Sequence, residues 1–331
     1  MRKTGRPTMV DVAAEAGVSF KTVSRVINGQ PHVDPAMAER VLAAVARLGY
    51  HRNALAASLR SGDRDTIGLV AADLSNTFYM AVAAAVSAVA TRERMHLIMA
   101  SSEEDAATER TLALDLCQRQ VGGLIVVPTA DDHSYLQREV ELGTPVVFLD
   151  RPGTGIPADT ILLDNRGGAR AAVAELLAAG HRRIAVLLDA RSIYTMSERW
   201  AGVEDAFSAA GRTPDPALVV DGLHTPTVAR DAMQRLLDSD EAPTAVFCAN
   251  NRLTIGALEA ILPRGADVEL AGFDDFELSR LLPRRIRVVD YDVADLGTRA
   301  AETLLRRAAT PATGSHSHLV PTRLVDRGGV R

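Results

Sequence analysis

The sequence predicts a small all-α headpiece followed by a larger α/β core built on parallel sheets. Helical periodicity with capping residues characterises residues 9–50, whereas short apolar strands alternate with amphipathic helices from Thr66 onward. At 331 residues, the chain is long enough for such a headpiece and a core of about two domains.

The first two helices are expected within residues 9–28, MVDVAAEAGVSFKTVSRVIN. Val12 and Ala16 lie on one apolar face of a short first helix. Gly17 can adopt the positive φ of a tight turn, and Ser19 can cap the second helix. The segment therefore has the pattern of a helix-turn-helix motif.

The second of these helices has two different faces. Val23, Val26 and Ile27 are expected to pack inward. The opposite face carries Phe20, Lys21, Ser24, Arg25 and Asn28. Arginine can fork onto guanine, asparagine onto adenine, and serine or lysine can hold phosphate, so this face suits a DNA major groove. The geometry alone is a modest signal, because many short helix pairs do not bind DNA.

A third helix is expected to begin at Asp34-Pro35, with aspartate as the cap and proline in the first position. Gly49 is placed to end it. Its core-facing stripe is predicted to contain Ala38, Val41, Leu42, Val45 and Leu48.

The charge distribution agrees with a nucleic-acid contact at one end of the chain. The formal net charge is −5, but residues 1–62 carry nine basic and four acidic side chains. A basic head on an acidic body places the phosphate-binding field in the headpiece. Cys117 and Cys248 lie far apart in apolar runs, which predicts buried reduced thiols rather than a disulfide or a metal site.

The core is expected to contain seven short buried strands with helices between them. The strands are TIGLVAAD, HLIMASS, GGLIVVPT, PVVFLD, IAVLLD, AVFCAN and VELAGF, and the helices include residues 79–93, 106–119, 166–179 and 199–210. This alternation predicts parallel sheets with crossover helices. In open sheets of this type, ligands bind beyond the carboxyl ends of the strands.

Several function classes are disfavoured. The chain contains no G-x-G-x-x-G after a strand, no G-x-x-x-x-G-K-[ST], no G-x-S-x-G and no metal-spaced His/Cys set, so we expect no enzyme, no catalytic residue, no cofactor and no metal. It begins MRKTGRP and has no apolar run long enough to span a bilayer, which argues against secretion and a membrane partner.

Two sets of motifs follow one another along the chain. The headpiece carries DVAAEAGVSFKTVSRVINGQPHVDPAMAERVLAAVARLGYHRNALAASLRSG. The core carries, in this order, TIGLVAADLSNTFY, VGGLIVVP, PVVFLDR, LLDNRGGARAAVAELLAAGHRRIAV, ERWAGVEDAF, AVFCANN, LAGFDDFELSRLL and LVPTRLVDRG. Any one piece would be weak, but the ordered set is highly specific. It resembles the LacI/GalR family of bacterial transcription regulators over essentially the whole chain.

The resemblance implies a domain plan. Residues 1–50 would form the helix-turn-helix headpiece, residues 51–65 a hinge helix and linker, and residues 66–331 an effector-binding core. The core would consist of two doubly wound parallel-sheet subdomains, like those of periplasmic sugar-binding proteins. The expected boundaries are about 66–162 plus 293–319 for one and about 163–290 plus 320–331 for the other.

The resemblance also implies DNA contacts. Phe20, Lys21 and Arg25 would read bases, and the phosphate or supporting residues would be Ser19, Thr22, Ser24, Asn28 and His32. Thr22 could equally be a local helix stabiliser. Asn53 and Leu59 fall where the family places its hinge helix, and Leu59 would wedge into the minor groove and kink the duplex. Arg52 stands where the family commonly has proline, and a plain linker remains the alternative for this segment.

The expected effector site lies in the cleft between the subdomains. Its predicted residues are Phe78, Tyr79, Asp150, Asp164, Arg199, His224, Asn250, Asp274 and Tyr291. Core packing for the aromatic pair, a salt bridge for Asp150 and a solvated loop position for His224 are open alternatives. Three residues depart from the family pattern: Thr77 replaces a frequent proline, Asn251 an aspartate and Tyr291 a glutamine.

Many acceptors with few apolar walls favour a polyhydroxylated effector such as a sugar, with a purine or another metabolite as the second choice. The expected protein is a cytoplasmic homodimer, associated with the nucleoid through an inverted-repeat operator in double-stranded DNA, and most simply a repressor. A sugar-binding protein without a DNA function is the alternative of another class.

Overall fold

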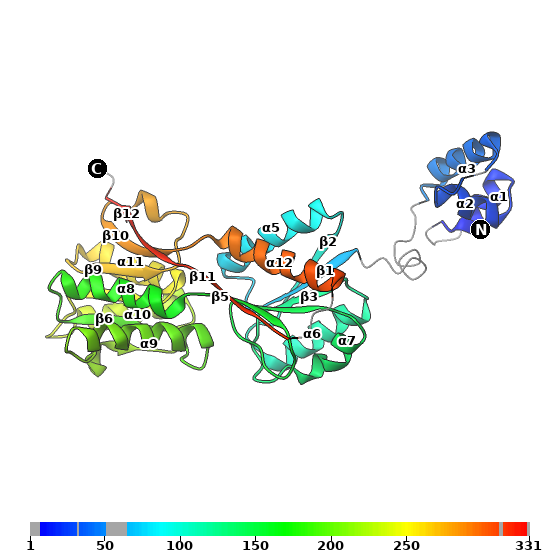
Figure 1. Cartoon of the computed structure of the whole chain (residues 1–331). Helices are drawn as coiled ribbons and strands as arrows, with labels where there is room; N and C mark the ends of the chain where they lie inside the picture. The colour runs from blue at the N-terminus through cyan, green and yellow to red at the C-terminus, as the bar shows by residue number, and fades with distance from the viewer. Residues whose placement is uncertain (1–6, 32, 51–64, 311–313, 330–331) are drawn as a thin grey trace. The chain divides into compact units, whose positions relative to one another are not determined.

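A computed structural model describes residues 7–31, 33–50, 65–310 and 314–329 (Figure 1). The predicted contacts of His32, Asn53 and Leu59, and the expected hinge helix, lie outside these described residues. The chain divides into two compact units, Met1–Asp63 and Arg64–Arg331.

The first unit contains three helices, α1 (Met9–Ala16), α2 (Phe20–Ile27) and α3 (Pro35–Leu48). Their ends are determined by local chemistry. The side chains of Ser19 and Asp34 accept backbone N–H groups at the starts of α2 and α3. Gly17 and Gly49 have φ of 64° and 61° at the ends of α1 and α3, a conformation that glycine adopts without strain.

The core of this unit differs from the predicted stripe in one position. Leu42 of α3 is 58% exposed, so its placement in the core was wrong. Val41 is fully buried and Val45 and Leu48 pack against the same cluster, as predicted, and Ala44, which the predicted stripe did not include, is fully buried as well. On α2, Val23 is buried and Val26 and Ile27 are partly buried, as predicted.

The second unit contains two six-stranded sheets, which we call the first and the second sheet. The first has the order β11-β5-β4-β3-β1-β2 and the second β12-β10-β9-β8-β6-β7. The first-sheet strands are β1 (Thr66–Ala71), β2 (His96–Ser101), β3 (Gly123–Val126), β4 (Val146–Leu149), β5 (Asp159–Leu163) and β11 (Ser317–Val320). The second-sheet strands are β6 (Ile184–Leu187), β7 (Val219–Val220), β8 (Ala245–Cys248), β9 (Glu269–Phe273), β10 (Arg285–Asp290) and β12 (Arg323–Gly328). All pairings are parallel except that of β12 with β10.

The chain passes between the two sheets three times. It leaves the first sheet after β5, returns to it after β10 through α12 (Val293–Ala309), and crosses again between β11 and β12. Figure 1 shows the last crossing as the red segment that joins the two groups of strands. The same strand order in both sheets makes β1 equivalent to β6, and β4 equivalent to β9.

Helices cover the sheets. α5 (Thr77–Arg92) packs on α12 over one face of the first sheet, and α6 (Ala106–Gln118), η1 (Ser134–Leu136) and α7 (Gln137–Glu141) belong to the opposite side. Around the second sheet, α8 (Asn165–Ala178) packs on α9 (Tyr194–Ala209), and α10 (Pro226–Leu237) packs on α11 (Asn251–Arg264). The remaining short helices are η2 (Pro216–Leu218) and η3 (Ser279–Leu281). Gly202 permits the close approach of α9 to α8, because a Cβ there would overlap the carbonyl oxygen of Arg166.

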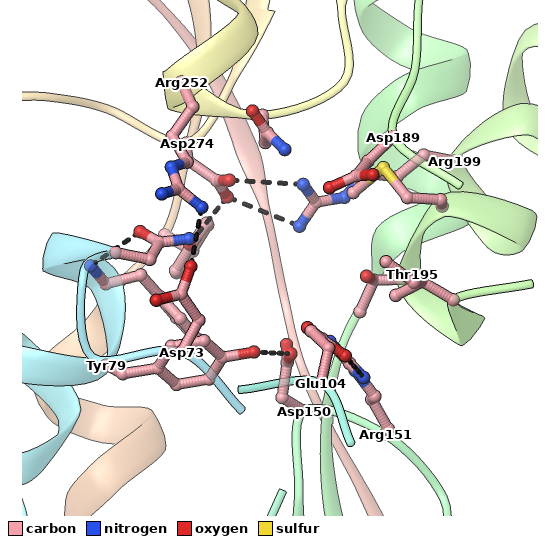
Figure 2. Close-up of a pocket in the computed structure, with 16 residues that line it drawn as sticks. Asp73, Tyr79, Glu104, Asp150, Arg151, Asp189, Thr195, Arg199, Arg252 and Asp274 are labelled. Carbon is pink, nitrogen blue, oxygen red and sulfur yellow. Dashed lines mark hydrogen bonds and ion pairs between the residues drawn. The ribbon is translucent and has the colours of Figure 1, made fainter. Parts of the chain in front are cut away.

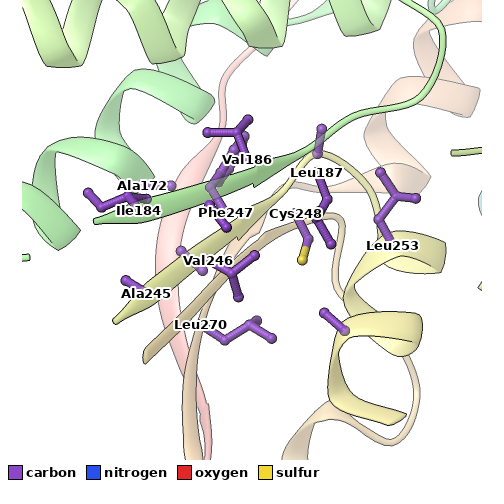
Figure 3. Packing of buried hydrophobic residues seen from close by; sticks show 14 of the residues in the cluster. Ala172, Ile184, Val186, Leu187, Ala245, Val246, Phe247, Cys248, Leu253 and Leu270 are labelled. Atoms are coloured by element: carbon purple, nitrogen blue, oxygen red, sulfur yellow. The ribbon is translucent and has the colours of Figure 1, made fainter. Parts of the chain in front are cut away.

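The second sheet has one continuous apolar core, shown in Figure 3. Phe247, Val186 and Leu187 are fully buried in it. Cys248 lies among these side chains, and burial raises the pKa of its thiol. Cys117 and Cys248 are both buried, as the sequence predicted.

Candidate functional site

The headpiece presents part of the predicted face of α2 to solvent. Lys21 and Asn28 are exposed and Phe20 is 47% exposed, whereas Ser24 and Arg25 are partly buried. Phe20 and Lys21 therefore stand side by side at the start of α2, where both can contact a partner.

Several polar groups of this face are already engaged within the headpiece. The Arg25 guanidinium donates to the carbonyl oxygen of Pro31 at 2.9 Å, and the Asn28 amide donates to the Ser24 carbonyl oxygen at 2.7 Å. Ser19 accepts the Thr22 N–H at 3.1 Å, and the two hydroxyls lie 2.9 Å apart. Thr22 therefore makes a local helix-stabilising contact, which the sequence left open as an alternative to a DNA contact.

A cleft lies at the carboxyl ends of the core strands and is lined from both sheets (Figure 2). Two aspartates hold equivalent places in it, since Asp150 follows β4 and Asp274 follows β9. Their φ values are 67° and 68°, and their N–H groups donate to Ile161 and Val289 of the neighbouring strands at 2.8 and 3.1 Å. Non-glycine residues with positive φ are uncommon and cluster at functional sites.

Each of these aspartates accepts a tyrosine hydroxyl. The Tyr79 hydroxyl donates to Asp150 at 3.3 Å, and the Tyr291 hydroxyl donates to Asp274 at 2.7 Å. Burial raises the pKa of both phenols well above their ordinary value, so both remain donors. Burial also raises the pKa of Asp150, although Arg151 and Arg199 oppose this shift.

Arg199 is the buried cation of the second-sheet side. Its side chain is 4% exposed and contacts the Asp274 carboxylate at 3.2 and 3.4 Å. Its Nε donates to the Asn165 side chain at 2.9 Å, and the guanidinium lies 3.6 Å from the ring centroid of Phe273. These contacts hold the planar donor group towards the cleft, where a ligand oxygen could share it.

A second arginine lies on the first-sheet side. Arg151 binds the Glu104 carboxylate through both terminal nitrogens, at 2.6 and 2.7 Å. It also donates to the Pro128 carbonyl oxygen at 3.2 Å. Glu104 has a φ of 57° in the loop after β2, so its backbone also adopts an uncommon conformation.

A third arginine bridges the cleft. Arg252 of α11 donates to the Asp73 carboxylate at 2.6 Å and to the Ser75 hydroxyl at 2.6 Å, both of which follow β1 in the first sheet. The Asn251 amide lies 3.5 Å from the side-chain oxygens of Asn76 and Thr77. We call the contact of Arg252 with Asp73 and Ser75 the clasp.

Aromatic rings form the apolar part of the cleft. Phe78 contacts Tyr79 and Tyr291 edge to face, with ring centroids 4.9 and 6.1 Å apart. All three rings line the cleft and also pack on the first-sheet core. The two alternatives that the sequence left open for Phe78 and Tyr79, a cleft wall and core packing, are thus both present.

The structure brings together seven of the nine predicted effector residues: Phe78, Tyr79, Asp150, Arg199, Asn250, Asp274 and Tyr291. Asn250 also caps α11 through a 2.9 Å bond from Leu253. Asp164 does not line the cleft, because its side chain caps α8 by accepting the Gly167 N–H at 2.9 Å. His224 does not line it either. It is 62% exposed and contacts Asp189, which does, at 2.6 Å.

Sequence reasoning missed nine lining residues: Asp73, Asn76, Glu104, Arg151, Asp189, Ile193, Thr195, Met196 and Arg252. Two of them could have been predicted as lining residues from their place just after a strand. Asp73 and Asp189 each stand two residues beyond the ends of the equivalent strands β1 and β6. Arg252 gave no such signal, because only tertiary structure brings α11 opposite the loop after β1.

Among the described residues, no group of three or more His, Cys, Asp or Glu side chains could hold a metal ion. No helix in the described part of the chain combines the length and the apolar character needed to cross a membrane.

The class of protein follows from the two units together: a DNA-binding headpiece joined to a core whose two sheets share a ligand cleft. Two family models match the chain. "Bacterial regulatory proteins, lacI family" covers residues 8–53, and "Periplasmic binding proteins and sugar binding domain of LacI family" covers residues 64–326.

Three relatives give the same result. The ribose operon repressor of Haemophilus influenzae is 33% identical over 92% of each chain. A crystal structure of the Lac repressor dimer bound to operator and the anti-inducer ONPF has a TM-score of 0.82 and 27% identity over 99% of this chain and 100% of that one. A complex of the transcriptional regulator CelR with cellobiose has a TM-score of 0.70 and 29% identity over 97% of this chain and 98% of that one.

The chain belongs to the LacI family and is a DNA-binding transcriptional regulator.

Proposed function

We propose that this chain is a repressor that binds an inverted-repeat operator as a homodimer and that a sugar in the core cleft controls its affinity for DNA. The observation that carries the proposal is the cleft itself, in which carboxylates, guanidinium groups and aromatic rings converge from both sheets. We assign operator binding to residues 1–50, the hinge to residues 51–65 and effector binding to residues 66–331. The two sheets with their helices are the proposed subdomains.

The chemistry of the residues that line the cleft supports a sugar as the effector. Asp150, Asp274 and Asn250 offer acceptors for hydroxyl groups, and Arg199 offers a donor fork. Phe78 supplies an aromatic wall against which an apolar ring face can pack. The names of the relatives agree with this proposal, since one is a ribose operon repressor and another was solved with cellobiose.

The DNA contacts are proposed from α2. Phe20, Lys21 and Arg25 would read bases, and the helix N-terminus capped by Ser19 would approach phosphate. The proposal assigns no catalytic step to this chain and places its action in the cytoplasm, where its operator would lie.

Control of DNA affinity requires an effector that binds two arrangements of the core unequally. A sugar that contacts Asp150 of the first sheet and Arg199 of the second would favour one relative position of the two sheets. Coupling energies between two sites are typically about 1–3 kcal/mol.

The test is the thermal stability of the purified chain with D-ribose, D-galactose, D-glucose and cellobiose. A sugar at about 100 times its dissociation constant should contribute roughly 2.7 kcal/mol to stability. Asp274→Asn should abolish the shift in melting temperature, because it removes the charge that orients Arg199 and Tyr291. Asp238→Asn, which breaks an exposed pair with Arg264 far from the lining residues, is the control. A shift that survives in Asp274→Asn would place the sugar elsewhere.

A further inference from the structure

The cleft contains more carboxylates than guanidinium groups. Its lining has five carboxylates, Asp73, Glu104, Asp150, Asp189 and Asp274, and three arginines, Arg151, Arg199 and Arg252. Each arginine contacts one carboxylate, in the pairs Arg151–Glu104, Arg199–Asp274 and Arg252–Asp73. The arginines of the lining are therefore matched by carboxylates before any ligand enters.

Two carboxylates of the lining have no arginine partner within the described residues. Asp150 is 4% exposed, accepts the Tyr79 hydroxyl, and lies close enough to Arg151 and Arg199 for both cations to oppose the rise in pKa that burial causes. Asp189 differs from it because it lies nearer to solvent, with 14% of its side chain exposed. Asp189 is therefore the lining carboxylate that has no arginine within ion-pair distance among the described residues and that also lies nearer to solvent.

Contacts on one side hold Asp189 in place. Its Oδ1 accepts the Ala190 N–H at 2.6 Å and lies 2.6 Å from Nδ1 of His224. Within the described residues of the core, no hydrogen bond is donated to its Oδ2, so this oxygen can accept one from a ligand. Its counterpart after the equivalent strand is Asp73, which Arg252 occupies.

We propose that Asp189, positioned by His224, sets the charge selectivity of the cleft, so that the site admits uncharged polyhydroxylated effectors and excludes anionic ones such as sugar phosphates. The inference rests on the proposed sugar effector and narrows its class. A phosphate group would enter a site whose cations are already paired and would face the Asp189 carboxylate, where like charges repel. His224 acts here through Asp189 and does not itself line the cleft.

The experiment compares each sugar with its phosphate: D-ribose with D-ribose 5-phosphate, D-glucose with D-glucose 6-phosphate, and D-galactose with D-galactose 1-phosphate. Dissociation constants are measured by calorimetry for the wild-type chain and for Asp189→Asn. The wild-type chain should bind the uncharged member of a pair at least about tenfold more tightly, and Asp189→Asn should reduce that ratio by about tenfold. Asp221→Asn removes an exposed carboxylate that pairs with Arg191 outside the cleft lining and should leave the ratio unchanged.

A double-mutant cycle tests the role of His224. His224→Ala should lower the ratio in the wild-type background and have no further effect in Asp189→Asn, since residues that act as one unit are not additive. His224→Asn, which can still donate a hydrogen bond, should restore part of the ratio. Additive effects would mean that His224 contacts the effector directly and would overturn its positioning role.

Three results would overturn the inference and can be told apart. A sugar phosphate that binds the wild-type chain as tightly as its parent sugar would reject charge exclusion and leave the sugar effector intact. A ratio unchanged in Asp189→Asn would reject Asp189 as its source. Binding of neither member of any pair would reject the sugar effector and this inference together.

Discussion

At the scale of single residues, the headpiece depends on what Arg25 does with its guanidinium group. In the free chain this group donates to the carbonyl oxygen of Pro31, so it is oriented across the segment that follows α2. Orientation before binding reduces the entropy lost when a flexible side chain meets its partner. This contact favours a role in base readout over a loose phosphate contact.

Arg25→Ala should relax the base preference at one operator position by about 1–3 kcal/mol. The measurement is binding to a pool of duplexes with every base substituted in turn. Arg40→Ala, which removes an exposed arginine from α3, is the control and should not change base preference. If Arg25→Ala weakened all sequences equally, Arg25 would hold phosphate only.

Glu109 stabilises the first-sheet core through hydrogen bonds to its buried carboxylate. It is fully buried and accepts hydrogen bonds from Thr129, the Ala130 N–H and the Tyr135 hydroxyl, with Nε2 of His133 at 3.2 Å. Burial alone would raise the pKa of Glu109, but these donors outweigh it and lower the pKa to about 2. The carboxylate thus ties α6 to the loop after β3.

Glu109→Gln should lower the free energy of unfolding in urea by about 3 kcal/mol, because it removes the carboxylate charge and replaces one accepting oxygen with an amide N–H group, so that some of the buried donors lose their acceptor. Since the folded pKa lies below the ordinary value of 4.5, the wild-type chain should lose this contribution as pH falls from about 4.5 towards 2. Glu141→Gln, an exposed change on α7, should cost less than about 0.5 kcal/mol. An equal cost for both variants would contradict the assigned role of Glu109.

At the scale of elements, α11 offers an internal comparison for the clasp. Arg252 at its start pairs with Asp73 of the first-sheet side, whereas Arg264 at its end pairs with Asp238 after α10. Both arginines contact an aspartate at 2.6 Å. Of these two pairs, only Arg252–Asp73 connects the second-sheet side of the core with the first-sheet side.

Arg252→Met should therefore raise hydrogen exchange in residues 73–79 by about tenfold or more, because hydrogen bonds to charged groups contribute about 1.5–3 kcal/mol. Arg264→Met should leave exchange there unchanged. Burial raises the pKa of Asp73, but its bonds with Ser75 and Arg252 lower it overall, so the clasp should weaken only as pH falls below the ordinary value. Equal exchange in the two variants would show that the clasp does not hold the two sides together.

Elements also show where sequence reasoning succeeds and fails. Apolar runs predicted β1, β3, β4, β8 and β9, because strands buried on both faces read as continuous hydrophobic segments. The strand β12 was not predicted from the sequence. It is an antiparallel edge strand, so its residues, RLVDRG, mix charged and apolar groups. The helix expected at 199–210 begins at Tyr194, without a side-chain cap that could have marked its start.

The cleft likewise contains residues that the sequence could predict and residues that it could not. Asp150, Asp274 and Asn250 were predictable because each stands at the end of a buried strand. Arg151 and Glu104 were not, because their pairing joins loops 47 positions apart in the chain. Asp164 was misplaced in the cleft because a residue at a sheet crossing can also cap the next helix, and here the cap prevails.

At the scale of the whole molecule, one chain combines two sites with different charge. Nine basic residues among the first 62 attract the phosphate backbone of DNA. The excess of acidic residues in the rest of the chain keeps the core from competing for the DNA. The cleft, by contrast, contains matched arginines and an excess of carboxylates. This division suits a polyanion at one site and an uncharged ligand at the other.

The central claim is that these two sites are coupled. The most direct measurement is the affinity of the full chain for a selected inverted-repeat duplex, at fixed salt, with and without a saturating sugar that raises its melting temperature. We predict a change of about 5–150-fold in the wild-type chain and none in Asp274→Asn. An operator affinity that stays constant while the sugar occupies the cleft would contradict the account.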